Sequence, residues 1–196
     1  MVVIDNGTDT IKIGMSGVDY PQIVIDTVAG TIEPNSDSDA VPPRNIFFGE
    51  PLREVLEEKK FRIQLSEPVE EAHIDDKHLE NMTELWRYAL SEQLGIELTN
   101  ANVLVIDSCA NKKDYKAKIA DVLMDKLKVK SLLIMNSSSL SLFSTGATTG
   151  FVAELGHGIS TVVPVYEGFV LPHALQRTNL SGKMFTQLLE QELQNE

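Results

Sequence analysis

The stretch TTGFVAELGHGISTVVPVYEGFVLPHALQRTNLSG, residues 148–182, determines which fold we expect. Two runs rich in β-branched residues flank the turn Gly156-His157-Gly158, and a second turn follows at Tyr166-Glu167-Gly168. A strand, a glycine turn and a strand form a hairpin, and a turn with few side chains can bring backbone N–H groups close to a phosphate. The stretch therefore predicts a β-hairpin with an anion-binding turn.

The N-terminus repeats this arrangement. Val2, Val3 and Ile4 run directly into Asp5-Asn6-Gly7-Thr8, so a glycine turn again follows a strand and has an acidic residue beside it. Two such turns, far apart in the sequence, predict a cleft shaped for a metal-bound polyphosphate.

The composition indicates a protein with a buried core and a strong negative charge. Of 196 residues, 42% are hydrophobic, and 29 acidic against 17 basic residues give a formal net charge of −12. This charge opposes binding to nucleic-acid backbones and to anionic membranes, so we expect neither as a partner. It fits contact with basic protein surfaces and simple solubility equally well.

Cysteine usage and the N-terminus indicate the compartment. Cys109 is the single cysteine, which excludes an internal disulfide and favours a reducing environment. The first predicted strand follows Met1 directly, so we expect no signal peptide, and no apolar run approaches the roughly 20 residues needed to cross a bilayer. These features predict a cytoplasmic protein, with the nucleus as the alternative.

Hydrophobic periodicity predicts a mixed α/β chain. Apolar residues recur at helical spacing over 75–94, so we expect Trp86 to lie in the core rather than in a ligand site. Residues 30–50 lack periodicity and predict an exposed loop or an inserted subdomain. The other expected elements are strands over 2–5, 11–16, 21–26, 102–107 and 131–135, helices over 51–60, 111–129 and 137–146, a hairpin over 150–165, and a helix from Ser181.

Several of these segments resemble the actin family, a branch of the superfamily of sugar kinases, heat-shock chaperones and actin ATPases. DNGTDTIKIGMSG, residues 5–17, is similar to the family's first phosphate loop, and VPVYEGFVLPHALQRTNLSG, residues 163–182, is specific to the actin branch. The resemblance implies an α/β fold with a ribonuclease-H-like mixed sheet, flanking helices and two domains around a nucleotide cleft.

The resemblance covers only the N-terminal half of that fold. It implies a first domain over residues 1–146, with a small inserted subdomain over about 28–68, and the beginning of a second domain over 147–196. The chain is therefore either a fragment or is completed by another polypeptide. A lone half would leave apolar faces in water.

The resemblance also implies a site for ATP or ADP with magnesium. Asp9 departs from the family's pattern, because a glycine is expected there and a carboxylate repels a polyphosphate. His157 stands where an aspartate is expected, and is either an anion contact or a tolerated turn residue, since Mg²⁺ prefers oxygen ligands. The implied nucleotide-binding residues, of which Asp5 and Glu154 are weak metal candidates, are Asp5, Gly7, Thr8, Lys12, Glu154, Gly156, His157, Gly158 and Gly182.

Catalysis is not expected. The family positions its attacking water with a glutamine and a histidine, and these positions fall on Ser137 and Thr161. Neither hydroxyl is a general base at neutral pH without an activating partner. Ser137 fits a helix cap better and is, with Asn136, a candidate N-cap of the helix that follows. The four histidines show no metal-ligand spacing with Cys109, and no P-loop motif is present. We expect no catalytic residues and no required cofactor, with nucleotide binding at most a vestige.

The remaining signals concern protein partners. EPNSDSDAVPPRN, residues 33–45, stands where the family's filament-forming loop lies, and its few apolar residues argue against filaments. Phe143, Gly146, Thr148 and Tyr166 match residues that line a groove for partner helices in the family, the alternative being plain core.

The sequence therefore favours a divergent actin-related protein that acts as a structural or scaffolding subunit without ATP hydrolysis. The alternative is a nucleotide-binding actin, able to form filaments, of which this chain is the N-terminal half. A small-molecule kinase is disfavoured, because no acceptor-binding group of residues is visible.

Overall fold

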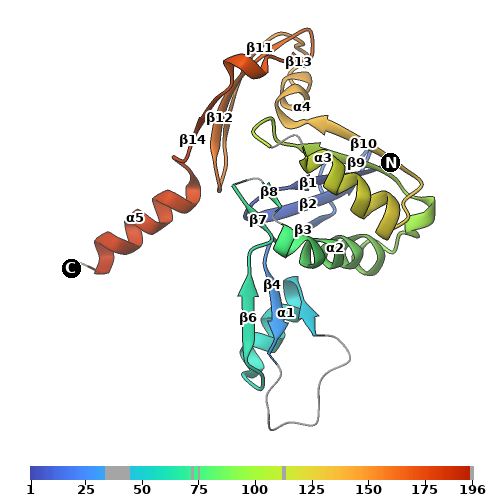
Figure 1. Ribbon diagram of the computed structural model, residues 1–196, viewed down its shortest axis with the longest axis vertical. Coiled ribbons are helices and arrows are strands. Elements are labelled where there is room, and N and C mark those ends of the chain that lie inside the picture. Colours follow the sequence, from blue (N-terminus) through green and yellow to red (C-terminus); the bar gives the residue numbers. More distant parts are fainter. Residues whose placement is uncertain (34–44, 72, 75, 112–113, 195–196) are drawn as a thin grey trace.

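A five-stranded mixed sheet, in the order β10-β9-β1-β2-β3, is the centre of the computed structural model (Figure 1). The structure describes residues 1–33, 45–71, 73–74, 76–111 and 114–194. β1, β2 and β3 are antiparallel neighbours, whereas β9 and β10 run parallel to β1. The expected antiparallel start and mixed α/β class are confirmed. The strands are β1 (Val2–Asn6), β2 (Thr10–Met15), β3 (Ile23–Asp26), β9 (Asn102–Asp107) and β10 (Ser131–Asn136).

Two helical segments cover one face of this sheet. Side chains alternate along a strand, and those of β1, β2 and β9 that point to the helices are fully buried with them in a single core. A 3₁₀ turn, η3 (Leu98–Asn100), leads into β9. The first segment comprises η1 (Asp76–His78, 3₁₀), α2 (Leu79–Arg87) and η2 (Tyr88–Gln93, π), and the second comprises α3 (Tyr115–Ala120) and η4 (Asp121–Lys126, π).

Both segments end differently from the uninterrupted α-helices that periodicity predicts. Leu94 donates its N–H to the Ala89 carbonyl at 3.1 Å, and Leu127 donates to the Val122 carbonyl at 2.8 Å, each across five residues. These turns are π-helical and hold one residue more than an α turn. A pattern of period 3.6 carries no signal for such a change.

The small unit below the central sheet in Figure 1 matches the residues expected for the inserted subdomain. It contains a three-stranded sheet, β5-β4-β6, and one helix, α1 (Gly49–Glu58), whose first turn includes Pro51 as predicted. The loop over 34–44 lies outside the described residues, and the domain boundaries stay predictions. The strands here are β4 (Ala29–Ile32), β5 (Ile46–Phe47) and β6 (Ile63–Ser66), followed by the hairpin of β7 (Val69–Glu70) and β8 (His73–Ile74).

A second sheet holds the predicted hairpin. β11 (Gly150–Leu155) and β12 (Ser160–Tyr166) are antiparallel, and β13 (Phe169–Val170) and β14 (Gln176–Thr178) pair with β12. One face packs on α4 (Ser137–Phe143) through Leu142, Val163 and Val165. A 3₁₀ turn, η5 (Pro172–Ala174), and the last helix, α5 (Gly182–Gln194), complete the chain.

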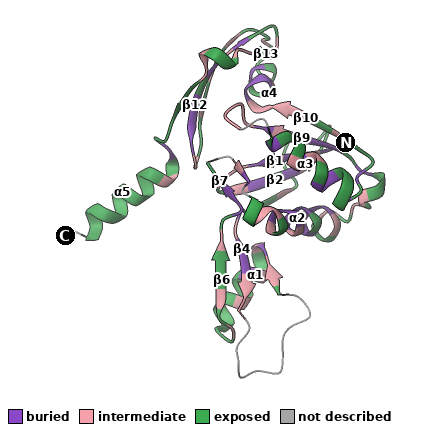
Figure 2. Cartoon of the chain, viewed as in Figure 1, coloured by how far each residue is buried: buried purple, intermediate pink, exposed green. Residues whose placement is uncertain are grey.

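The opposite face of the second sheet exposes apolar side chains to solvent. Phe151, Leu155 and Phe169 are 81%, 85% and 77% exposed. α5 extends away from the sheet and is exposed along its length (Figure 2), although it carries an apolar stripe that includes Phe185 and Leu189. Within the described residues, no helix has both the length and the apolar character needed to span a bilayer.

Trp86 lies in the core, as predicted, and also makes a polar contact. The residue is fully buried, and its Nε1–H donates to Oδ1 of Asn6 at 3.0 Å. This hydrogen bond joins α2 to the last residue of β1, where the first glycine turn begins. Trp86 therefore holds in place the residue at which the first glycine turn begins.

We predict that Trp86→Phe lowers the free energy of unfolding by about 1–3 kcal/mol, because it leaves the buried Asn6 amide oxygen without its donor. Urea unfolding followed by circular dichroism measures the change. In an Asn6→Ala background the same substitution should cost clearly less, since the acceptor is already gone. Equal costs in both backgrounds would show that packing alone accounts for the effect.

Candidate functional site

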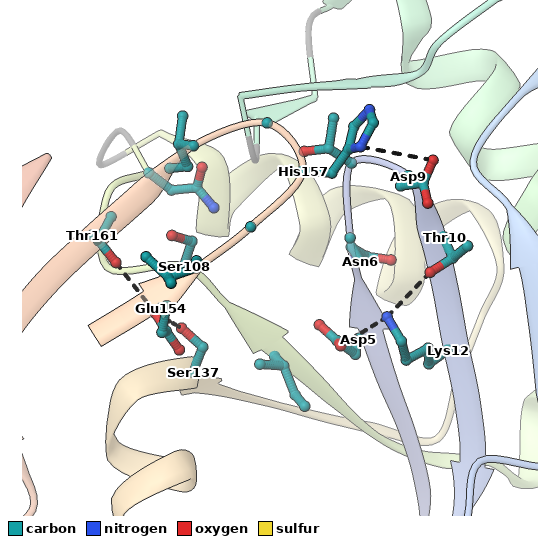
Figure 3. A pocket seen from close by; sticks show the side chains of 18 of the residues that line it. Asp5, Asn6, Asp9, Thr10, Lys12, Ser108, Ser137, Glu154, His157 and Thr161 are labelled. Carbon is teal, nitrogen blue, oxygen red and sulfur yellow. Dashed lines mark hydrogen bonds and ion pairs between the residues drawn. The ribbon is translucent and has the colours of Figure 1, made fainter. Parts of the chain in front are cut away.

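The two glycine turns meet at one cavity of about 390 Å³, between the β1–β2 turn and the β11–β12 hairpin (Figure 3). Of the residues expected to bind nucleotide, all but Gly182 line it. Gly182 lies just behind the second turn, where its N–H donates to the Gly156 carbonyl at 3.0 Å. The fold thus brings together residues that are about 150 positions apart in the sequence.

The turns touch each other directly. A Cβ added to Gly158 would lie 2.6 Å from Oγ1 of Thr8, and a Cβ added to Gly182 would lie 3.4 Å from the His157 backbone. Distances under 3 Å require something to shift, so Gly158 must remain a glycine for Thr8 to occupy its place. This contact holds the second turn against the first.

Tight turns explain the other two glycines. A Cβ on Gly7 would lie 2.5 Å from the Thr10 carbonyl oxygen, and one on Gly156 would lie 2.7 Å from the Ile159 carbonyl oxygen. The chain itself therefore requires glycine at these positions. Their presence does not by itself indicate a phosphate.

The first turn presents one cation to the cavity, already engaged with its neighbours. Lys12 Nζ donates to Oγ1 of Thr10 at 3.1 Å and lies 3.9 Å from Oδ2 of Asp5. Burial raises the pKa of Asp5 above the ordinary aspartate value, and the charge on Lys12 opposes this shift. Asp5 is accordingly a weaker acid than a free aspartate.

Two of the departures from the family's pattern, Asp9 and His157, face each other. His157 Nδ1, on the second turn, lies 4.0 Å from Oδ1 of Asp9, on the first (Figure 3). Protonation of the imidazole would make this contact an ion pair between the turns. His157 therefore has a defined place beside Asp9, on the cavity wall.

Three hydroxyl groups converge on one oxygen of Glu154. Oε2 accepts hydrogen bonds from Ser137 at 3.1 Å, from Ser138 at 3.0 Å and from Thr161 at 3.4 Å. Ser137 and Thr161 occupy the positions where water-activating side chains are expected. Here their hydroxyls donate to a carboxylate instead of accepting a proton from water.

Of the two predicted cap residues of α4, Asn136 is confirmed and Ser137 is wrong. The Asn136 side chain accepts a hydrogen bond from the Ser138 N–H at 3.0 Å. Ser137 is already inside the helix, and its hydroxyl is therefore free to reach Glu154.

Sequence reasoning missed several residues that line or support the cavity. Ser108 and Asn111 line it, and so does Tyr115, which is also buried in the core as its helical spacing indicates. Behind them, the buried Asp107 carboxylate accepts from Nδ2 of Asn111 at 2.7 Å. Burial raises the pKa of Asp107, opposed by that hydrogen bond and by Lys116. The sequence offered one indication that Asp107 lies near the cavity, namely its position at the end of a strand predicted to be buried.

Tyr115 offers no phenolate to the cavity. Burial raises its pKa above the ordinary tyrosine value, and the charge on Asp107 raises it further. The phenol is therefore protonated at any physiological pH and cannot act as a base.

The residues present do not fit a magnesium-bound polyphosphate well. Three carboxylates, those of Asp5, Asp9 and Glu154, face the cavity against Lys12 and His157. Oε2 of Glu154 is already occupied by hydroxyl donors. Across the described part of the chain, no group of three His, Cys, Asp or Glu side chains is placed to hold a metal ion.

The residues proposed to line a partner groove lie at the other end of the second sheet. Phe143 and Tyr166 are 41% and 57% exposed, so they are not plain core. Gly146, with φ of +80°, ends α4, and the Thr148 carbonyl accepts from the Gly168 N–H at 2.7 Å. Partner docking at these residues stays a prediction.

Ion pairs join the segment from Glu67 to Glu71, around β7, to the second sheet and α5. Arg177 of β14 pairs with Glu71, beside the β7–β8 hairpin, and Lys183 of α5 pairs with Glu67 at 2.5 Å. All four side chains are between 37% and 52% exposed. These pairs connect residues more than 100 positions apart.

Comparison with known proteins agrees with this arrangement. A model of the Actin family matches residues 1–196. The chain belongs to the actin family. It is 29% identical over 192 residues to a protein named actin-like protein 9 from Bos taurus. That alignment covers 98% of this chain and 44% of the relative, so the chain spans less than half of that relative's length. The resemblance and the incomplete actin-like fold are thereby confirmed.

Cys109 provides a probe of the Glu154 cluster. Its Sγ lies 3.7 Å from Oγ of Ser138. Burial raises the pKa of the thiol above its ordinary value, the Ser138 hydrogen bond lowers it, and the charge on Glu154 raises it again.

We predict that Glu154→Gln lowers the pKa of Cys109, because it removes a nearby negative charge that disfavours the thiolate. Iodoacetamide should then alkylate the thiol at least about twofold faster at pH 8, and the midpoint of the pH–rate profile should move down. Glu167→Gln, on a distant turn, is the matched control and should change neither quantity. An unchanged profile in Glu154→Gln would contradict the geometry of the cluster.

Proposed function

We propose that this actin-family chain is a structural or scaffolding subunit of a larger protein assembly and does not hydrolyse ATP. One observation carries the second part of the proposal. The hydroxyls of Ser137 and Thr161, at the positions where water activation is expected, both donate to Glu154.

Neither Tyr115 nor Asp107 can replace them as a base. A general base must accept a proton near neutral pH and reach the attacking water. Tyr115 is held protonated, and Asp107 does not line the cavity. The carboxylates of Asp5 and Asp9 lie on the turn that would face the phosphates. Consequently, we propose no catalytic residue, no required metal and no required cofactor.

We predict that the purified chain with magnesium and ATP releases inorganic phosphate no faster than buffer alone. A coupled phosphate assay over several hours measures this at protein concentrations of tens of micromolar. Steady, magnesium-dependent release that disappears in Asp5→Asn or Glu154→Gln would refute the proposal. A release that survives both substitutions would indicate a contaminating ATPase.

The structural role is supported by the bare apolar surfaces. The outer face of the second sheet and the stripe on α5 together expose at least eight large apolar side chains. Surfaces of this kind mark binding sites or aggregation hazards. We propose that another part of an actin fold covers them, either continuous with this chain or supplied as a separate polypeptide. With a net charge of −12, we propose protein partners in the cytoplasm or nucleus rather than nucleic acid or membrane. The side chains in question are Phe151, Leu155, Val162, Tyr166, Phe169, Phe185, Leu189 and Leu193.

We predict that the isolated chain binds the dye ANS and self-associates, because these faces are in water. Co-expression with the actin-family segment that lies beyond the matched region should give a soluble one-to-one complex. The triple variant Phe151→Thr, Leu155→Thr, Phe169→Thr should bind that segment at least about tenfold more weakly, whereas Tyr20→Thr, an exposed residue elsewhere, should bind normally. A stable monomer without dye binding would contradict the proposal.

A second candidate is favoured by the cavity itself. Two glycine turns and Lys12 surround a volume of about 390 Å³, an arrangement suited to phosphate groups. On this alternative, the chain is the N-terminal part of a nucleotide-binding actin that forms filaments. Tight magnesium-dependent ATP binding together with salt-induced pelleting would favour it over the scaffold.

A further inference from the structure

The free edge of the central sheet has unpaired backbone groups. β3 is the last strand in the order β10-β9-β1-β2-β3, so one of its edges has no neighbouring strand within the described residues. Thr27, which directly follows β3, donates its N–H to the Asp9 carbonyl at 2.8 Å and therefore points its backbone groups toward β2. Along an antiparallel strand, the N–H and C=O groups of successive residues point alternately toward the neighbouring strand and away from it. In this register the backbone N–H and C=O groups of Ile23 and Ile25 point toward β2, and those of Val24 and Asp26 point away from the sheet.

A groove runs along this edge. Its volume is about 480 Å³, and all four residues of β3 line it together with the first turn of α1 and the end of η2. Gly49, with φ of +56°, lets α1 begin close to the strand: a Cβ there would lie 3.3 Å from the Ile25 side chain and 3.9 Å from the Tyr88 ring. Four strand residues span roughly 13 Å, which defines the length of the groove.

The rim of the groove is acidic. Asp26, Glu50 and Glu54 line it with a single cation, Arg53. Arg53 is engaged on both sides, since it lies 2.8 Å from Asp26 and 3.8 Å from Glu50. Three carboxylates against one guanidinium leave a net negative rim.

We propose that the β3 edge binds an extended, basic peptide segment of another protein by strand addition. The outward groups of Val24 and Asp26 supply two donors and two acceptors for its backbone, and the acidic rim selects lysine or arginine side chains. This surface lies at the opposite edge of the central sheet from β10, and the inference does not rest on the proposed function.

The test selects linear heptapeptides displayed on phage against the full 196-residue chain, with its completing polypeptide where one co-purifies. Binders are then measured by fluorescence anisotropy. Val24→Pro removes an outward N–H that makes no ladder bond, and proline is tolerated at such edge positions. Val24→Thr keeps the N–H and the β-branched shape and is the matched control. Glu54→Lys changes the charge of the rim on the exposed side of α1 and leaves the strand intact, so it remains informative if Val24→Pro does not fold.

We expect selected peptides to be rich in lysine and arginine and to protect the Val24 and Asp26 amides from hydrogen exchange. They should bind Val24→Thr like the parent, and Val24→Pro and Glu54→Lys at least about tenfold more weakly. Failure to recover binders, binders without basic residues, or unchanged binding to both variants would overturn the proposal. Self-association of the chain that Val24→Pro abolishes would place a second copy at this edge and would also overturn it.

Discussion

The site depends on the packing of one glycine turn against the other. The Thr8 side chain fills the space that a Cβ on Gly158 would need. Because the two turns touch at this point, the contact limits how closely the β1–β2 turn and the β11–β12 hairpin approach each other. The cavity and the pairing of Asp9 with His157 depend on that approach. The Trp86–Asn6 hydrogen bond fixes the end of the strand that leads into the first turn.

Two features of the cavity depart from what the family resemblance implies. One oxygen of the Glu154 carboxylate has its hydrogen bonds supplied by three hydroxyl groups of the same chain. Satisfied groups of this kind stabilise a fixed arrangement and leave fewer partners for water or metal. The added Asp9 carboxylate finds an imidazole of the same chain within reach.

Much of the fold could be predicted from the sequence, because it depends on local patterns. The strand over 102–107, the hairpin at Gly156–Gly158 and the burial of Trp86 each follow from periodicity or turn chemistry. The π turns after Arg87 and Ala120 could not be predicted, since one such turn at the end of a helix changes the apolar spacing over too few residues to show in the pattern. The resemblance named the cavity residues. The hydrogen bonds from Ser137 and Thr161 to Glu154 could not be predicted, because they join side chains of separate elements whose relative positions no local pattern determines.

The ion pairs Glu71–Arg177 and Glu67–Lys183 have a consequence for the shape of the molecule in solution. They lie at the surface, so dissolved ions compete with them over a Debye length of about 8 Å at physiological ionic strength. The contact of the segment around β7 with the second sheet and α5 therefore weakens as the ionic strength rises. A chain in dilute buffer and the same chain in molar salt are expected to differ in compactness, without any change in sequence or ligand.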